Sequence, residues 1–228
     1  MTIYIKMHKG KTKYMTNYTT DDIIQIEDQE IEKVEEYKYL GQTLKMKYCT
    51  QEEVMRRIKA GWSCFGRHKE MLCNKNIPMT WRRKILNQCV LPTMTYGAET
   101  WTMTKNLEKK LQTAQRAMER SMLHISIRDK IRCSIIRQKT GVKDIIVKIK
   151  EAKWRWAGHV ARMRDNRWTK RLMDWQPRIG KRRRGRQKTR WRDDLTTYLG
   201  TTWAREAADR RNWNYHEEGY IRPWVDIA

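Results

Sequence analysis

The sequence predicts a mainly α-helical protein that begins with a small β unit. Up to about residue 49, short runs alternate polar and apolar side chains, which is the period of a β-strand. From about Thr50 onward, apolar residues recur every three or four positions, which is the period of an amphipathic helix. With 228 residues, 39% of them hydrophobic and 33% charged, the chain can form one domain or two small domains around a modest core.

The β unit is predicted from three runs. Residues 12–16 and 23–26 are strand-like, and a polar stretch separates them. Residues 37–44 alternate aromatic and polar side chains around a glycine, which suits a hairpin. Alternation places Tyr37 and Tyr39 on one face of that hairpin, where they either stack on a ligand or cover the sheet.

Two helices are predicted after the β unit. The first begins at about residue 50, because one of its faces carries a stripe of apolar side chains, namely Val54, Ile58, Trp62 and Phe65. Residues 74–78 break it. The second is expected over residues 81–91 with Thr80 as its N-cap, and Pro92 is expected to kink or end it.

The clearest helical pattern covers residues 105–125. Thr104 precedes it and can act as its N-cap. Its apolar stripe consists of Leu107, Leu111, Ala114, Met118 and Met122.

Residues 131–139 and 142–163 are predicted to form a short and a longer helix. Thr140 and Gly141 separate them as a stop signal. Such a pair can be a helix-turn-helix that reads DNA, although the same arrangement is common in all-α proteins. In the longer helix, Trp154 and Trp156 fit core packing better than base stacking.

Two more helices are expected near the C-terminus. They cover residues 191–199 and residues 203–213, with Thr202 as the N-cap of the second.

The net charge of +24 is the dominant feature of the composition, with 50 Lys and Arg against 26 Asp and Glu. Residues 1–50 are neutral, whereas residues 51–150 have 22 basic and 8 acidic side chains, and residues 151–228 have 20 and 10. A chain this basic repels itself, so a polyanionic partner is expected. We expect that partner to be nucleic acid, whether RNA, DNA or their hybrid, and expect neither a membrane nor a small-molecule substrate.

A run of eight cations and two glycines at residues 178–190 has no helical or strand period, and we expect a flexible basic loop there. It can be a nuclear localisation signal, a phosphate-binding loop or a solvated segment. Trp168, Trp175 and Trp191 lie around it, and indoles that stack on unpaired bases contribute roughly 1–3 kcal/mol each. This combination favours nucleic acid.

The candidate phosphate-binding residues are spread over the basic part of the chain. They are Arg56, Arg57, Arg82, Arg83, Lys153, Arg155, Arg162, Lys181, Arg182, Arg183, Arg184, Arg186, Lys188 and Arg190.

Five cysteines with no CxxC pair indicate a reducing compartment. There is no apolar run of the length that a membrane span needs, and no signal peptide, so an intracellular location, nuclear or cytoplasmic, is expected. Cys64, His68 and Cys73 lack the close pairing typical of zinc ligands, so neither a metal nor another cofactor is expected in this chain. His159 is expected to be packed and neutral.

Three segments follow one another along the chain. They are KTKYMTN at residues 11–17, VEEYKYLG at 34–41, and KWRWAGHVARM at 153–163, the last followed by Gly185-Arg186 and by RWRDD at 190–194. Together they resemble the C-terminal portion of the reverse transcriptase of non-LTR (LINE-like, RTE-type) retrotransposons, the endonuclease-reverse transcriptases. The resemblance covers almost the whole chain, and YGAETW at 96–101 also fits it.

The resemblance implies three parts. Residues 1–49 would be a remnant of the palm, where Lys11 and Lys13 belong to the last palm motif. A primer-grip hairpin there would hold the 3′ end of the growing strand through Tyr37, Tyr39, Leu40 and Gly41. Residues 50–125 would be the helical thumb, which closes over the template–primer duplex. Residues 126–228 would be a basic, Trp-rich helical C-terminal extension that contacts element RNA or target DNA.

The resemblance also implies that the catalytic carboxylates are absent from this chain. In the parent enzymes, one Asp and a Tyr/Phe-x-Asp-Asp hairpin hold two Mg²⁺ ions upstream of the primer grip, which would lie before residue 1. Asp21-Asp22 has the wrong spacing and position and fits a capping loop better. Asp193-Asp194 fits the start of a helix. We therefore expect no catalytic residues and no polymerisation by this chain alone.

Three hypotheses follow for the function. The leading one is a nucleic-acid-binding fragment of a reverse transcriptase whose parent activity is RNA-directed DNA polymerisation in target-primed reverse transcription. A rival is a stand-alone helix-turn-helix DNA-binding module with a basic arm. The third is a transposon relic without function.

Overall fold

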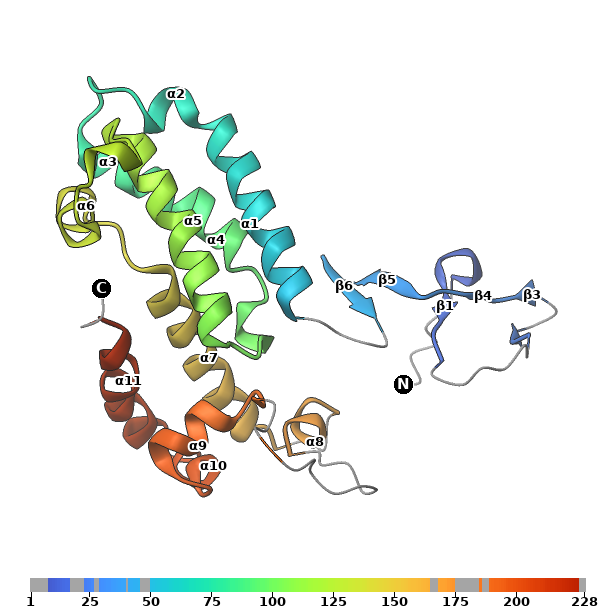
Figure 1. The fold of residues 1–228 in the computed structure, drawn as a ribbon. Coiled ribbons are helices and arrows are strands. Elements are labelled where there is room, and N and C mark those ends of the chain that lie inside the picture. Colours follow the sequence, from blue (N-terminus) through green and yellow to red (C-terminus); the bar gives the residue numbers. More distant parts are fainter. Residues whose placement is uncertain are drawn as a thin grey trace, which may run out of the picture. The chain divides into compact units, whose positions relative to one another are not determined.

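The computed structural model describes residues 8–16, 23–26, 29–39, 41–45, 50–164, 168–174, 185 and 189–225. The chain divides into two compact units, Met1–Glu53 and Val54–Ala228. Short strands occur in the first unit and helices make up the second, which confirms the predicted mainly α class with a small N-terminal β unit (Figure 1).

The described residues of the first unit form three pairs of short strands. β1 (Lys13–Tyr14) pairs in parallel with β4 (Glu32–Lys33), and β2 (Gln25–Ile26) pairs antiparallel with β3 (Gln29–Glu30). Ile31 is buried.

The predicted hairpin is the third pair. β5 (Glu36–Tyr39) runs antiparallel to β6 (Gln42–Lys45), with Tyr37 opposite Leu44. Gly41 in the connecting turn has φ 78°, a left-handed conformation that glycine adopts without a steric penalty. This is why the alternation at 37–44 contains a glycine.

The second unit opens with helices packed around one core. α1 (Thr50–Arg67), whose first residues belong to the first unit, buries the predicted stripe residues Val54 and Phe65. A short α2 (Lys69–Leu72) and a loop follow, and α3 (Met79–Ile85) begins after Pro78. The predicted cap at Thr80 is therefore wrong, because Pro78 already turns the chain and the helix starts one residue before Thr80.

Pro92 does not end the helix, but the backbone changes its form just before it. After α3 the backbone widens into a π-helical turn, η2 (Leu86–Val90), and continues as α4 (Leu91–Met94), which contains the proline. Proline cannot donate to the carbonyl four residues back, and a π-turn relieves the clash. The helix thus does not end at Pro92, and a π-helical turn precedes the proline.

α5 (Lys105–Leu123) confirms the clearest helical pattern. The Thr104 side chain accepts a hydrogen bond from the backbone N–H of Leu107 at 3.4 Å, as an N-cap does. A 3₁₀ turn, η3 (Ala98–Thr100), precedes this helix, and another, η4 (Ile127–Asp129), follows it.

α6 (Cys133–Thr140) ends at Gly141, which has φ 60°, and α7 (Ile145–Ala161) begins after Asp144. The predicted stop and the predicted helix pair are confirmed. His159 of α7 is exposed, so the expectation that it is packed was wrong.

The C-terminal helices differ from the prediction. α8 (Trp168–Asp174) was not predicted, whereas α9 (Asp193–Leu199) was. The helix expected over 203–213 is two helices, α10 (Trp203–Glu206) and α11 (Arg210–Val225). Thr202 makes no capping bond, while Asp209 accepts from Arg211 N at 2.8 Å and starts a new helix there.

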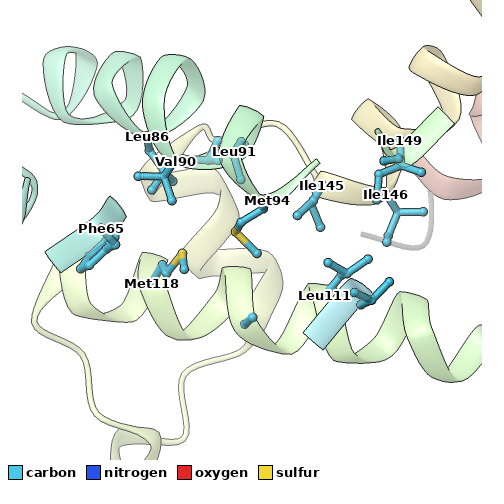
Figure 2. Close-up of a cluster of buried hydrophobic side chains, with 14 of the residues drawn as sticks. Phe65, Leu86, Val90, Leu91, Met94, Leu111, Met118, Ile145, Ile146 and Ile149 are labelled. Atoms are coloured by element: carbon cyan, nitrogen blue, oxygen red, sulfur yellow. The ribbon is translucent and has the colours of Figure 1, made fainter. Parts of the chain in front are cut away.

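Two hydrophobic cores meet on α7. The first core joins α1, α4 and α5, and α7 adds Ile145, Ile146 and Ile149 to it (Figure 2). The second core joins α7 to α9, α10 and α11 through Trp154 and Ala157. α7 therefore connects the parts that the resemblance assigns to thumb and extension, and that division remains a prediction.

Candidate nucleic-acid interface

In the second unit, which we call the helical unit, folding buries a larger share of the acids than of the cations. Between residues 54 and 150 the chain has 22 Lys and Arg and six Asp and Glu. Four of these cations (Arg57, Arg82, Arg116 and Lys150) and three of the acids (Glu108, Glu119 and Asp144) are buried. Of the remaining eighteen cations, Lys105, Arg137 and Lys143 pair with Glu108, Asp144 and Glu151. Only three acids of this range, Glu70, Glu99 and Asp129, are not buried. A phosphate that approaches this part of the chain meets few negative charges.

One buried polar network holds α5 against α6 and α7. The Arg116 guanidinium donates to Glu119 at 2.5 Å and to Asp144 at 2.7 Å. Asp144 also accepts from the backbone N–H of Ile146 at 2.7 Å, so it caps α7. Burial raises the pKa of Glu119, and Arg116 only partly offsets this effect. Glu119 and Asp144 are therefore engaged in interactions within the protein.

A second network joins α7 to α9 and α11. Asp194 accepts from Lys150 at 2.8 Å, from Lys153 at 2.7 Å and from the Tyr220 hydroxyl at 2.8 Å. Burial alone would raise the pKa of Asp194, but Lys153 and Lys150 outweigh it and the pKa is lowered. Burial lowers the pKa of Lys153 to about 8, because desolvation outweighs the attraction of Asp194, and the neighbouring Lys150 lowers the pKa further.

A stack of aromatic rings completes the second core. The rings of Trp154 and Trp213 stack with centroids 3.7 Å apart and an angle of 8° between their planes. Each indole donates to the other residue's backbone carbonyl, at 3.2 Å from Trp154 and 3.1 Å from Trp213. Gly158 makes room for this, because a Cβ there would lie 2.7 Å from Cδ1 of Trp213. Trp154 is a core residue, as its pattern favoured, while Trp156 is half-buried.

Two parts of the third segment of the resemblance, KWRWAGHVARM and RWRDD, are thus joined in space. In KWRWAGHVARM, Lys153, Trp154 and Gly158 are buried, while Arg155 and His159 are exposed. Lys153 donates both to Asp194 and to the backbone carbonyl of Trp191, so this segment holds RWRDD in place. The motifs have a structural role in the described fold.

Several predicted phosphate-binding residues turn inward, which corrects the prediction for them. Lys153 is 1% exposed, and its ammonium group donates a hydrogen bond to Asp194. Arg82 is 8% exposed and donates to the carbonyl of Met122 at 2.7 Å. Arg57 is buried, with its guanidinium 4.5 Å from the ring centre of Tyr96. These cations stabilise the fold, because their donors are directed at protein acceptors or rings.

Arg162 and Trp191 are also bound within the protein. Arg162 donates to the carbonyl of Ala207 at 2.8 Å. The Trp191 indole donates to the carbonyl of Glu99 at 2.7 Å, and Lys153 lies 4.9 Å from its ring centre. Trp191 packs against the second core, so it is not a free platform for a base.

Other predicted residues remain at the surface. Arg155 is exposed, and Arg56, Arg83 and Arg190 are half-buried. Trp168 is 73% exposed, with the Arg171 guanidinium 5.4 Å from its ring centre. The predicted residues Leu40, Trp175, Lys181, Arg182, Arg183, Arg184, Arg186 and Lys188 lie outside the described residues, as do Asp21 and Asp22.

In the β unit, the hairpin and the segment at 11–17 are linked. The Tyr37 hydroxyl donates to the carbonyl of Lys11 at 3.2 Å, while Tyr39 is 56% exposed. Lys13 forms an ion pair with Glu32 across the parallel strands. Tyr37 therefore supports the fold, and Tyr39 is the tyrosine whose ring is available to a ligand.

The structure also places at the surface a group of cations that the sequence did not single out. They lie between the end of α5 and the end of α6, and are Arg120, which is half-buried, and the exposed Arg128, Lys130, Arg132 and Lys139. A signal was present, because residues 120–139 contain six Lys and Arg against the single acid Asp129. It is weaker than the signal at 178–190, where the cations are denser.

A groove of about 570 Å³ runs between α1 and α5. Met55, Ile58 and Trp62 form one wall, and Lys109 and Lys110 lie on the other. Lysines beside a partly exposed indole can contact a phosphate and an unpaired base together.

The described residues contain no cluster of metal ligands: no group of three or more His, Cys, Asp or Glu side chains there is placed to hold a metal ion. Both carboxylates of RWRDD are in use, because Asp193 accepts from the N–H of Arg190 at 2.7 Å and Asp194 from two lysines. No helix in that part of the chain has the length and apolarity needed to cross a bilayer.

No protein-family model matches the chain, and neither does any solved structure. The chain is 30% identical over 235 residues to an uncharacterized transposon-derived protein of Caenorhabditis elegans. The match covers 92% of this chain and 81% of the worm protein. On this similarity, which extends over both the β unit and the helical unit, the chain belongs to a family of transposon-derived proteins.

Proposed function

We propose that this protein binds nucleic acid through the phosphate backbone, as the thumb and C-terminal part of a non-LTR retrotransposon reverse transcriptase. One observation carries the proposal: eighteen cations and only three acids lie outside the core between residues 54 and 150. Such a surface favours a polyanion without distinguishing its sequence. The transposon-derived relative supports the ancestry.

The parent activity would be RNA-directed DNA polymerisation, which needs carboxylates that hold two Mg²⁺ ions. The sequence has no Tyr/Phe-x-Asp-Asp segment, and the carboxylates of RWRDD are engaged within the protein. Purified protein with a template–primer, Mg²⁺ and nucleotides is therefore expected not to extend the primer. Extension above that of a no-protein control would contradict this expectation.

Nothing specific favours the helix-turn-helix alternative. A recognition helix presents its N-terminal residues to the major groove. In α7 the corresponding residues, Ile145 and Ile146, are fully buried, and α7 lies between two cores. The burial of these residues therefore does not support α7 as a recognition helix.

Fluorescence anisotropy tests the proposal. An RNA–DNA template–primer, a single strand and a plain DNA duplex are each titrated with the protein from low to high salt. We expect binding to all three that weakens steeply with salt, because counterion release drives it. Tighter binding to the template–primer would support a functioning thumb and primer grip. Absence of binding at low salt would overturn the proposal, as would a strong preference for one duplex sequence that persists in moderate salt.

A further inference from the structure

A group of surface cations around the start of α6 lies on one short stretch of chain. We call Arg120, Arg128, Lys130 and Arg132 the α6 corner. Arg128, Lys130 and Arg132 are exposed, and within the described part of the chain none of the three has an ion-pair partner. The Arg120 guanidinium lies 3.6 Å from Sγ of Cys133, the first residue of α6. The four side chains therefore extend from the end of α5 to the start of α6.

The acids near the corner are occupied elsewhere. Asp129 turns back to accept from the N–H of Ser126 at 2.7 Å, and forms a capping box with it. Glu119 and Asp144 are buried with Arg116, and Asp144 also lies 3.4 Å from Arg137. The local carboxylates stabilise the backbone and leave the corner's cations for an external anion.

The backbone that carries the corner is held in a defined shape. Lys130 has φ 52°, a left-handed conformation that a lysine adopts only when its surroundings impose it. Next to the corner, His124 contacts the segment that follows α2, where its Nε2 lies 2.7 Å from the backbone carbonyl of Cys73. α6 starts with no acid in its first turn and no side-chain cap, so its N-terminus adds to the positive potential.

From this arrangement we infer that the α6 corner binds the phosphate backbone of a nucleic-acid duplex. Among the described residues of 120–139, the large exposed apolar side chains are Ile127 and Ile135, which are aliphatic. Single strands are bound by aromatic side chains that stack on bases, and this stretch has no Phe, Tyr or Trp. Cations carried on a well-defined backbone, without such stacking platforms, match the regular phosphates of a duplex. The inference rests on the proposed function and assigns a specific surface and ligand form to it.

The test compares two triple variants of the full chain that each remove three positive charges. The corner variant is Arg128→Gln/Lys130→Gln/Arg132→Gln. The control is Arg205→Gln/Arg210→Gln/Arg211→Gln, whose side chains are also exposed but belong to α10 and α11. Each variant is titrated with a duplex of about 20 base pairs and a single strand of the same length, over a range of salt concentrations.

We expect the corner variant to bind the duplex about tenfold or more weakly and to reduce the salt slope by about three units. The control should change the slope by about one unit or less. The corner variant should lose less affinity for the single strand than for the duplex. Equal losses for the two variants, or a larger loss on the single strand, would overturn the inference while leaving the proposed function intact. Failure of the unchanged protein to bind any nucleic acid would instead overturn the proposed function.

Because the three side chains have no partner within the described residues, the thermal melt of the corner variant should match that of the unchanged protein. The variant Arg128→Lys/Arg132→Lys provides a second check, because it keeps every charge. It is expected to retain duplex affinity within about threefold, since backbone contacts depend mainly on charge. A loss as large as that of the Gln variant would show that the side chains act in some other way, and would also overturn the inference.

Discussion

At the scale of single residues, Gly158 shows how the second core depends on the absence of a side chain. The indole of Trp213, which stacks on Trp154, approaches the backbone of α7 at this position. Helices tolerate glycine poorly, and the glycine in the last turn of α7 has a packing reason here.

Gly158→Ala is expected to lower the free energy of unfolding by about 2–3 kcal/mol, because the new methyl group overlaps the Trp213 ring. Gly66→Ala is the matched control, since Gly66 also lies in a helix and a Cβ there would have no neighbouring atom within 4 Å. The control should gain up to about 1 kcal/mol from helix propensity. Urea unfolding followed by circular dichroism measures both. Equal stabilities for the two variants would contradict the tight packing of the indole.

The burial of Lys153 leads to a prediction about how the unfolding free energy depends on pH. Burial lowers its pKa to about 8 from the ordinary 10.5. Between these values the unfolded chain binds a proton that the folded protein does not, so the contribution of Lys153 to the unfolding free energy rises with pH across this window. Relative to Lys153→Met, the unchanged protein should gain stability by roughly 1 kcal/mol per pH unit at most. Urea unfolding of both proteins at several pH values across this window measures the difference. A difference that stays constant or falls with pH would show that Lys153 is not desolvated.

At the scale of elements, Asp144 joins three helices. It caps α7, lies 2.7 Å from Arg116 of α5, and lies 3.4 Å from Arg137 of α6. This buried carboxylate therefore links the α6–α7 turn to α5 and α6.

Asp144→Ala should therefore lower the unfolding free energy by about 3–5 kcal/mol, because it leaves a buried guanidinium only partly paired and removes a cap. Thr104→Ala removes only the cap of α5 and should lower it by about 1 kcal/mol. Thermal or urea unfolding of the two variants gives the comparison. If the two variants lost the same unfolding free energy, the Asp144 network would contribute nothing to stability beyond ordinary capping.

Helix ends were the least predictable elements, and for a local reason. Thr80 has the side chain of a cap, but α3 begins after Pro78. Thr202 does precede a helix, α10, but makes no capping bond, and α10 ends early because a further helix begins after Asp209. Several nearby residues can start a helix, and small differences in backbone geometry choose among them.

At the scale of the whole molecule, the net charge of +24 governs association with any polyanion. The described surface and the basic run at 178–190 are separate sources of this charge. Their contributions to binding can therefore be measured independently.

Replacing Arg182, Arg183, Arg184 and Arg186 with Gln should weaken binding to every nucleic acid alike and flatten the salt slope by roughly three to four units. Anisotropy titrations at increasing salt give the slope for the variant and the unchanged protein. An unchanged slope would mean that this run is solvated and makes no phosphate contacts. Binding that remains in the variant would then be attributed to cations elsewhere in the chain.

The sequence by itself determined the class of the fold, the main helices and the basic character. Helical period, strand alternation and signals such as Thr104 and Gly141 act over a few neighbouring residues, so they can be read from the chain directly. Net charge is a sum that folding does not change.

Only the tertiary structure decided which cations face outward. Lys153 meets Asp194 across 41 residues of sequence, and Trp154 meets Trp213 across 59. Such partners are chosen by packing between distant segments, and no local pattern contains them. The same packing buries Arg82 beneath the end of α5 and leaves Arg128, Lys130 and Arg132 exposed, because a cation turns inward only where the fold supplies an acceptor for it.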